Sequence, residues 1–350
     1  MCIRDRGAAG AAGAVSARAE SGALAALADE DAVRDEAAGA SALASTLYAQ
    51  PALFALEFAL AKLLASRGLC PSAACGHSLG EYVAAVVAGV MSVEDGARLV
   101  ALRSQLVAAL PEGVGAMAAV FAPEARVRAA LADTCAEGRA TIAAVNGPAA
   151  VTISGERAAV DATVVAMGAK HRALHVSHAF HSPLLAPIVG TFREHVRRAR
   201  LRAPAEAADA SVAEGFAACA ADAPLFVTCL AAPGDDVAAD GATAWSAPHL
   251  VEHWVRHLLE PVRFEGAARR LLRGELRCSA LVELGPHATL LGLVRHILPP
   301  HPHGAPPLAL VGLQACDEDA AEAFDVALDA LAAAGVRVER TAGRRTRAPE

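Results

Sequence analysis

The chain has 350 residues, of which 55% are hydrophobic and 20% charged, and its formal net charge is −7. This composition excludes a disordered chain, and the length predicts one large core with a smaller inserted or appended unit. The acidic balance offers no footprint for nucleic acid or an anionic membrane, and no run of about 18 uninterrupted apolar residues predicts a transmembrane helix.

The eight cysteines are scattered and form no Cys-x-x-Cys pair, and some lie in apolar runs such as 225–230. A chain of this length can build a core without disulfides, so we interpret them as buried thiols in a reducing compartment. Arg4, Arg6 and the Ala/Gly repeats after them resemble a signal peptide only weakly, because alanine and glycine make a poor hydrophobic segment. We therefore expect a cytoplasmic protein.

The first part of the chain predicts a helix, a strand and two further helices. Residues 1–45 are rich in alanine and glycine without a sustained leucine or valine face, so we leave them unassigned as flexible or marginally helical. Leucines at helical spacing predict a helix over 52–66, and Arg67-Gly68 ends it. An apolar strand over 69–75 and Ala/Val-rich helices over 83–90 and 93–109 follow.

The middle of the chain predicts a small separate unit. An apolar strand at 116–121 and a helix at 123–136 precede two strands that turn at Asn146-Gly147-Pro148, and a helix at 156–168 and a strand at 172–176 complete the series. The order strand, helix, strand, strand, helix, strand is typical of a ferredoxin-like unit.

The last part alternates helices and strands before a linker. We expect a helix-rich segment at 183–202, strands at 225–230 and 280–284, helices at 247–259 and 264–272, and a further strand and helix within 307–338. The cluster Pro299-Pro300-His301-Pro302-His303 is typical of a linker.

Residues 76–80 read Gly-His-Ser-Leu-Gly, the Gly-x-Ser-x-Gly pattern of a nucleophile elbow. In such an elbow a serine hydroxyl projects from a tight strand-to-helix turn, with glycines on either side, and helical N–H groups face the developing oxyanion. Ser78 is therefore the candidate nucleophile. A flexible run that merely joins a strand to a helix fits the five residues equally well.

A serine nucleophile needs a base, and thirteen histidines compete for this role. His181 is the best placed, because it ends the run His178-Ala179-Phe180-His181 where the chain would return from the small unit to the large one. A core or solvent-facing histidine is the alternative. Arg103 could bind a substrate carboxylate, and a solvated surface arginine is the alternative for this residue.

These features occur together with further motifs, and the combination resembles the acyltransferase domain of modular type I polyketide synthases. The resemblance runs from about residue 48 to about 294, and several independent motifs occur in the order of that family. The segments that carry it are Tyr48 to Phe54 (Tyr-Ala-Gln-Pro-Ala-Leu-Phe), Gly76 to Tyr82, Arg103, Val145 to Pro148, Ser177 to Pro183, His257 to Phe264 and Glu283 to His287.

The resemblance implies a malonyl-CoA:acyl carrier protein transacylase of the α/β class. Its large α/β-hydrolase-like subdomain, with a parallel sheet, would span 46–115 and 179–298, the inserted ferredoxin-like small subdomain 116–178, and a post-acyltransferase linker 299–350. Ser78 would attack malonyl-CoA while His181 takes its proton, and the phosphopantetheine thiol of an acyl carrier protein would then accept the malonyl group. The family orients the base with a backbone carbonyl, which would be that of His257, and needs no bound cofactor or metal.

The resemblance also implies which residues bind the substrate. Arg103 would pair with the free carboxylate of malonate. His178 and Phe180 belong to the four-residue motif that accompanies malonyl selectivity, and Phe180 would occupy the space of a 2-methyl group. Asn146 matches a cleft-side asparagine of the family, although an ordinary turn explains its triplet equally well.

One feature of the family is missing from the sequence. The family opens with a strand and a Gly-Gln-Gly segment, whose glutamine N–H joins the N–H of Leu79 in the oxyanion hole, yet no glutamine precedes Gln50. We expect a truncated or mis-assembled reading frame and reduced activity, since one lost oxyanion donor costs about 2.7 to 4 kcal/mol.

Two other function classes stay open. An esterase or thioesterase would place an acidic triad member between the serine and the histidine, and nothing between Ser78 and His181 singles one out. A synthase fragment that only docks beside neighbouring domains, such as a ketosynthase, is the non-enzymatic alternative.

Overall fold

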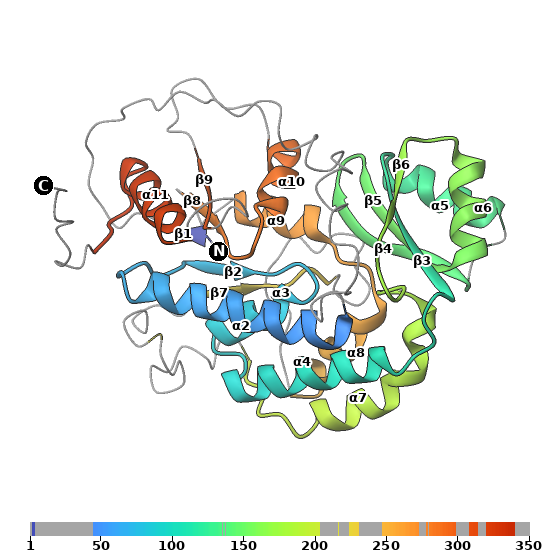
Figure 1. Cartoon of the computed structure of the whole chain (residues 1–350), viewed down its shortest axis with the longest axis horizontal. Coiled ribbons are helices and arrows are strands. Elements are labelled where there is room, and N and C mark those ends of the chain that lie inside the picture. The colour runs from blue at the N-terminus through green and yellow to red at the C-terminus, as the bar shows by residue number, and fades with distance from the viewer. Residues whose placement is uncertain are drawn as a thin grey trace, which may run out of the picture.

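The computed structural model describes residues 2–3, 45–134, 136, 138–203, 216, 224–230, 247–272, 278, 280–298, 308–313 and 320–339. The predictions for most of 1–45, and for those parts of the linker at 299–350 that are absent from these ranges, therefore lie outside the described residues. Figure 1 shows an α/β architecture with two sheets, the smaller of which lies to one side of the larger.

The larger sheet has the order β7-β2-β1-β8-β9. Its strands are β1 (Cys2–Ile3), β2 (Ala73–Cys75), β7 (Leu225–Val227), β8 (Ala280–Glu283) and β9 (Ala309–Gly312). The pairs β2–β7 and β8–β9 are parallel, as expected, whereas β1 runs antiparallel to both neighbours. Excluding all of residues 1–45 from the fold was therefore wrong for Cys2 and Ile3, whose backbone pairs with the facing edges of β2 and β8.

Helices cover this sheet on both sides (Figure 1). They are α2 (Thr46–Ala65), α3 (Gly80–Val87), α4 (Val93–Ala108), α7 (Val189–Val196), α8 (Ala247–Leu259), α9 (Phe264–Leu272), α10 (Thr289–Ile297) and α11 (Ala320–Ala333), with a 3₁₀ turn, η3 (Pro183–Ile188), before α7. Helix α2 begins six residues before the predicted start, because the Ser45 hydroxyl caps it by accepting from Leu47 N–H.

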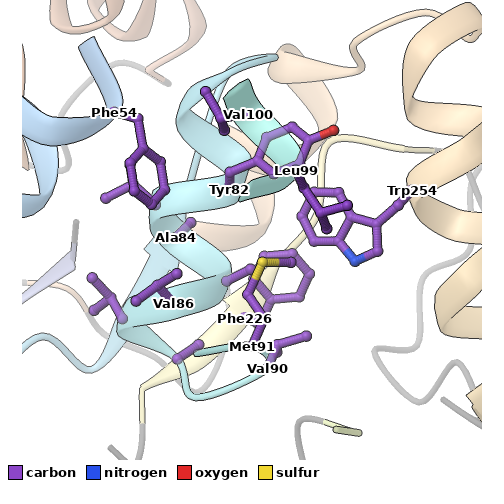
Figure 2. Packing of buried hydrophobic residues seen from close by; sticks show 14 of the residues in the cluster. Phe54, Tyr82, Ala84, Val86, Val90, Met91, Leu99, Val100, Phe226 and Trp254 are labelled. Carbon is purple, nitrogen blue, oxygen red and sulfur yellow. The ribbon is translucent and has the colours of Figure 1, made fainter. Parts of the chain in front are cut away.

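Helix α3, which follows the elbow, is buried almost all round. Figure 2 shows Phe54 of α2, Leu99 and Val100 of α4, Phe226 of β7 and Trp254 of α8 packed about it. A helix that is apolar on all faces needs neighbours on all faces, and the Ala/Val-rich sequence 83–90 meets this condition. The position of the elbow is therefore fixed from four elements.

The smaller sheet forms a unit of its own (Figure 1, right). Its elements are β3 (Gly115–Val120), α5 (Glu124–Asp133), β4 (Ala140–Gly147), β5 (Ala150–Glu156), α6 (Arg157–Met167) and β6 (His171–Leu174). The strand order is β4-β5-β3-β6 and all neighbours are antiparallel, so the predicted ferredoxin-like fold is confirmed.

A short segment of the large subdomain extends this small sheet. Val145 N–H donates to the carbonyl of Val262 over 2.8 Å, and Val262 N–H donates to that of Ala143 over 2.9 Å. Next to this bridge, Arg263 forms an ion pair with Glu124 of α5 at 2.7 Å. The two subdomains are therefore joined by backbone hydrogen bonds and not only by their covalent connections.

Among the described residues, α2 alone is long and apolar enough to cross a membrane by length and composition. It contains Pro51, and its Phe54, Leu60 and Leu64 are buried in the core, so we interpret it as a core helix. The prediction of buried thiols holds for Cys229, which is free and buried, and in part for Cys75, which is free but only half-buried. It is wrong for Cys70 and Cys278, which are disulfide-bonded.

Candidate active site

The elbow turns tightly between β2 and α3, and its first glycine is required by space. A Cβ atom on Gly76 would lie 2.0 Å from the carbonyl carbon of Gly80, closer than any real contact. At Gly80 itself a Cβ would lie 3.4 Å from Glu57, an ordinary van der Waals distance. The tight turn therefore requires a glycine at position 76 and leaves room for a Cβ atom at position 80.

Ser78 and His181 lie in direct contact, 103 positions apart in the sequence. Ser78 Oγ is 2.7 Å from His181 Nε2. Both residues have positive φ values, 49° and 53°, and they are the only non-glycine residues with positive φ in the described part of the chain. Such backbone strain persists only where the surroundings hold it, and it concentrates at functional sites.

The tautomer of His181 follows from its second hydrogen bond. Its Nδ1 lies 3.1 Å from the carbonyl oxygen of Glu260, and because a carbonyl only accepts, Nδ1 carries the proton. Nε2 is then an unprotonated acceptor that faces the Ser78 hydroxyl. Burial, and next the positive charge of Arg103, lower the pKa of His181 to about 3, so the imidazole is neutral at pH 7.

The carbonyl that orients the base belongs to Glu260, so the assignment of this role to His257 was wrong. Glu260 lies just beyond the last residue of α8, Leu259, where the chain leaves the helix. Its carbonyl, three residues after that of His257, is the one that reaches His181 Nδ1. His257 contributes its side chain instead. Its Nε2 donates to the carbonyl oxygen of Ser78 over 3.1 Å.

Arg103 is 2% exposed and lies beside the base. Its guanidinium carbon is 5.7 Å from the centre of the Phe180 ring, one residue before His181, and its Nη1 donates to Gln50 Oε1. Its buried Nε has no partner among the described residues. Burial lowers the pKa of Arg103, which still stays protonated because guanidinium pKa values lie far above neutrality.

His178 is buried, and both of its ring nitrogens have protein partners. Nε2 lies 3.1 Å from the carbonyl of Leu110, which requires a proton there, and Nδ1 lies 3.0 Å from Ser177 Oγ. The expected contact between His178 and a substrate can therefore involve only its ring carbons. The hydrogen bond from Nε2 holds the loop that contains Phe180 against the chain at the end of α4.

Asn146 lies at the end of β4 and contacts the elbow. Its Oδ1 is 2.9 Å from His77 Nε2, and burial lowers the pKa of His77, so the neutral ring donates this hydrogen bond. The His77 ring also packs 5.7 Å from Phe264. Asn146 thus attaches the small subdomain to the elbow, and its binding of a substrate stays a prediction.

The expected oxyanion donor, Leu79 N–H, begins the first turn of the elbow helix. Leu79 is the residue before α3, and its N–H has no acceptor among the described residues. The N-terminus of α3 adds the positive end of the helix dipole at the same point. A negatively charged oxygen at this position would therefore be stabilised.

Sequence reasoning missed a buried polar cluster behind the elbow. Glu81 accepts from Thr228 Oγ1 at 2.7 Å, from Cys229 N–H at 3.1 Å and from His253 Nε2 at 2.9 Å. In the sequence, a glutamate in the first turn of a helix indicates only a favourable interaction with the helix dipole, because these partners lie more than 140 positions away. Gln50 was overlooked for the same reason, although the motif that contains it had been noted.

Among the residues that the structure describes, no group of three or more His, Cys, Asp or Glu side chains could hold a metal ion. The chemistry available to the site lies in its hydroxyl, imidazole, guanidinium and backbone N–H groups. Together they define an α/β protein with a serine–histidine pair on a nucleophile elbow.

The chain belongs to the acyl transferase domain family, whose model matches residues 15–338. It is 41% identical over 257 residues to polyketide synthase GfsB of Streptomyces halstedii, and 39% identical over 264 residues to the phenolphthiocerol synthesis polyketide synthase Pks15/1 of Mycobacterium marinum. These matches cover 73% and 75% of the chain but only 4% and 11% of those two synthases.

Solved structures agree with this assignment. The acyltransferase domain from the second module of the salinomycin polyketide synthase is 37% identical, with a TM-score of 0.70 over 86% of this chain and 63% of that one. An acyl carrier protein S-malonyltransferase from Vibrio cholerae is 26% identical, with a TM-score of 0.64 over 83% of this chain and 82% of that one. The chain is thus an acyltransferase with the predicted α/β fold.

Proposed function

We propose that this chain transfers a malonyl group from malonyl-CoA to the phosphopantetheine thiol of an acyl carrier protein, by way of an ester on Ser78. The contact of 2.7 Å between Ser78 Oγ and the unprotonated Nε2 of His181 carries the proposal. Hydrolases share such a pair, but they orient the histidine with a carboxylate. Here the partner of Nδ1 is the backbone carbonyl of Glu260.

In the first half-reaction, His181 Nε2 takes the Ser78 proton while Oγ attacks the thioester carbonyl of malonyl-CoA. The oxyanion forms against Leu79 N–H, and its collapse breaks the C–S bond, with the imidazolium protonating the CoA sulfur. In the second, His181 takes the proton of the phosphopantetheine thiol, the sulfur attacks the ester, and the Ser78 oxygen leaves with that proton. Each half-reaction returns a neutral imidazole.

Arg103 supports malonyl as the acyl group. A buried guanidinium with an unpartnered Nε suits a carboxylate, which would accept two charge-assisted hydrogen bonds. The bound carboxylate would also offset the positive charge that contributes to the low pKa of His181, so the base would strengthen when the substrate binds. A neutral acyl chain would leave this buried charge uncompensated.

The setting of the reaction is the second part of the proposal. Relatives are polyketide synthases of which this chain matches a small part, and one similar structure, 27% identical, holds a type II polyketide acyl carrier protein in complex with its malonyl-transacylase. We therefore expect an acyl carrier protein as the partner, a ketosynthase and other synthase domains as neighbours, and a cytoplasmic location.

The experiment is self-acylation with radiolabelled malonyl-CoA, followed by transfer to a holo acyl carrier protein. We expect one labelled serine per chain, located at Ser78 by peptide mapping, and no label in Ser78→Ala. Release of free malonate faster than transfer would favour a thioesterase. A folded protein that takes up no label would refute acyl transfer and favour the alternative, a synthase fragment that only docks beside neighbouring domains.

A further inference from the structure

We infer that His257 is a positioning residue, whose side chain orients the oxyanion-binding N–H of Leu79 by holding the carbonyl of Ser78 from behind. The inference rests on the proposed function, because it concerns the oxyanion of the acyl transfer. It concerns a side chain for which sequence analysis had expected only a main-chain role.

The first step is the peptide geometry. The carbonyl oxygen of Ser78 and the N–H of Leu79 belong to one planar trans peptide unit, and in such a unit C=O and N–H point in opposite directions. Any group that fixes the direction of the carbonyl therefore fixes the direction of the N–H. His257 Nε2 lies 3.1 Å from that carbonyl oxygen, and Glu81 N–H donates to the same oxygen over 2.9 Å.

The peptide unit between Ser78 and Leu79 needs contacts that keep its orientation. Ser78 has a φ of 49°, in the left-handed region that a non-glycine residue adopts only at a cost. A relaxed elbow would rotate the peptide that follows Ser78. Two donors on one carbonyl oppose this rotation, and hydrogen bonds to the oxygen also polarise the amide, which strengthens its N–H as a donor.

The His257 imidazole is neutral and carries its proton on Nε2. His257 is 1% exposed, and burial, followed by the charges of His181 and Arg103, lowers its pKa well below the ordinary value. A neutral ring has one N–H, and the carbonyl acceptor places it on Nε2. His257 Nδ1 has no partner among the described residues, so the bond to Ser78 is the one the ring makes as a donor.

The ring has little freedom to leave this position. It packs edge-on against Tyr82, with ring centres 5.3 Å apart, and lies 5.5 Å from the Trp254 ring. Glu81 Oε2 lies 4.0 Å from its Nε2, and the same carboxylate binds His253 one turn earlier on α8. The buried cluster behind the elbow thus fixes α8, and through it both the His257 side chain and the Glu260 carbonyl.

The test compares two substitutions that differ in hydrogen-bond donors. His257→Leu fills the space without a donor, and His257→Gln retains an N–H₂ group that can reach the carbonyl. The control is His249→Leu, because His249 is exposed and lies in the first turn of the same helix. The measurements are the rate constant of Ser78 acylation by malonyl-CoA in a single turnover, the steady-state KM, and the rate of labelling by a fluorophosphonate, whose phosphoryl oxygen also needs the oxyanion donor.

We expect His257→Leu to acylate roughly 10- to 100-fold more slowly, below the 10²- to 10³-fold loss when a donor is removed outright, with KM nearly unchanged. Labelling by the fluorophosphonate should slow in parallel, and His257→Gln should recover most of both rates. Equal losses in the two variants, or losses that follow the fall in melting temperature, would show a role in packing alone and overturn the inference. Failure of the unsubstituted protein to acylate would instead refute the proposed function.

Discussion

Replacing Arg103 by methionine should remove the preference for malonyl over acetyl groups. Methionine keeps much of the volume at this 2%-exposed position and removes a charge that burial already disfavours. A buried charge without an opposite charge beside it costs free energy, and an apolar side chain of similar size removes that cost. The variant should therefore fold, with Gln50 Oε1 as the acceptor that loses its Arg103 donor.

The magnitude follows from the contacts that remain available. Arg103 Nη1 is used by Gln50, while Nε is free of partners in the described part of the chain, so a carboxylate can gain charge-assisted bonds in a site screened from water. Hydrogen bonds to charged groups contribute about 1.5 to 3 kcal/mol. This predicts a fall in kcat/KM for malonyl-CoA of about 10- to 150-fold, since each 1.4 kcal/mol corresponds to about a factor of ten.

The assay is the rate of Ser78 acylation with malonyl-CoA and with acetyl-CoA under subsaturating conditions. For acetyl-CoA we expect an equal or higher rate in Arg103→Met, because no carboxylate needs the charge. The control is Arg98→Met on the same helix, where the side chain is 79% exposed and pairs with Asp95 of its own helix. An unchanged malonyl-to-acetyl ratio in a folded Arg103→Met protein would refute the reasoning.

Four further outcomes follow from the site and the fold. The acid limb of kcat/KM for acylation should lie below pH 6.5, since burial lowers the pKa of His181 from 6.5 to about 3, and an inflection at 6.5 in the pH profile would contradict this. Below pH 6.5 the unfolded chain binds more protons than the folded one. The free energy of unfolding should therefore decrease as the pH falls below 6.5, by up to about 1.4 kcal/mol per pH unit for each buried histidine whose pKa is lowered. Urea unfolding at pH 7.5 and 5.5 measures this decrease. Phe180→Ser should raise acylation by methylmalonyl-CoA relative to malonyl-CoA by about tenfold or more, as one methyl group changes binding by about 1 to 3 kcal/mol, and competition between the two substrates measures it. Gly76→Ala should abolish acylation and lower the melting temperature, because its Cβ would meet the Gly80 backbone at 2.0 Å, whereas Gly190→Ala, where a Cβ meets open space, should do neither.

Much of the fold could be predicted because the signals are local. The ferredoxin-like order of β3 to β6 follows from apolar runs and turn residues that are close in the sequence, and helices α8 and α9 have the bounds that their periodicity predicts. The central position of Cys2–Ile3 could not be predicted, because two residues carry no periodic pattern. Their pairing with β2 and β8 depends on strands more than 70 positions away.

The candidate site also has a part that the sequence predicts and a part that only the tertiary structure shows. Residue types alone left an alternative open for each of Ser78, His181 and Arg103, and the order of motifs shared with the acyltransferase family selected them. The identity of the carbonyl that binds His181, and the side-chain bond from His257 to the elbow, depend on how α8 ends and how it packs on α3. Direction at a helix end is set by tertiary contacts such as Glu81 with His253, which no local spacing encodes.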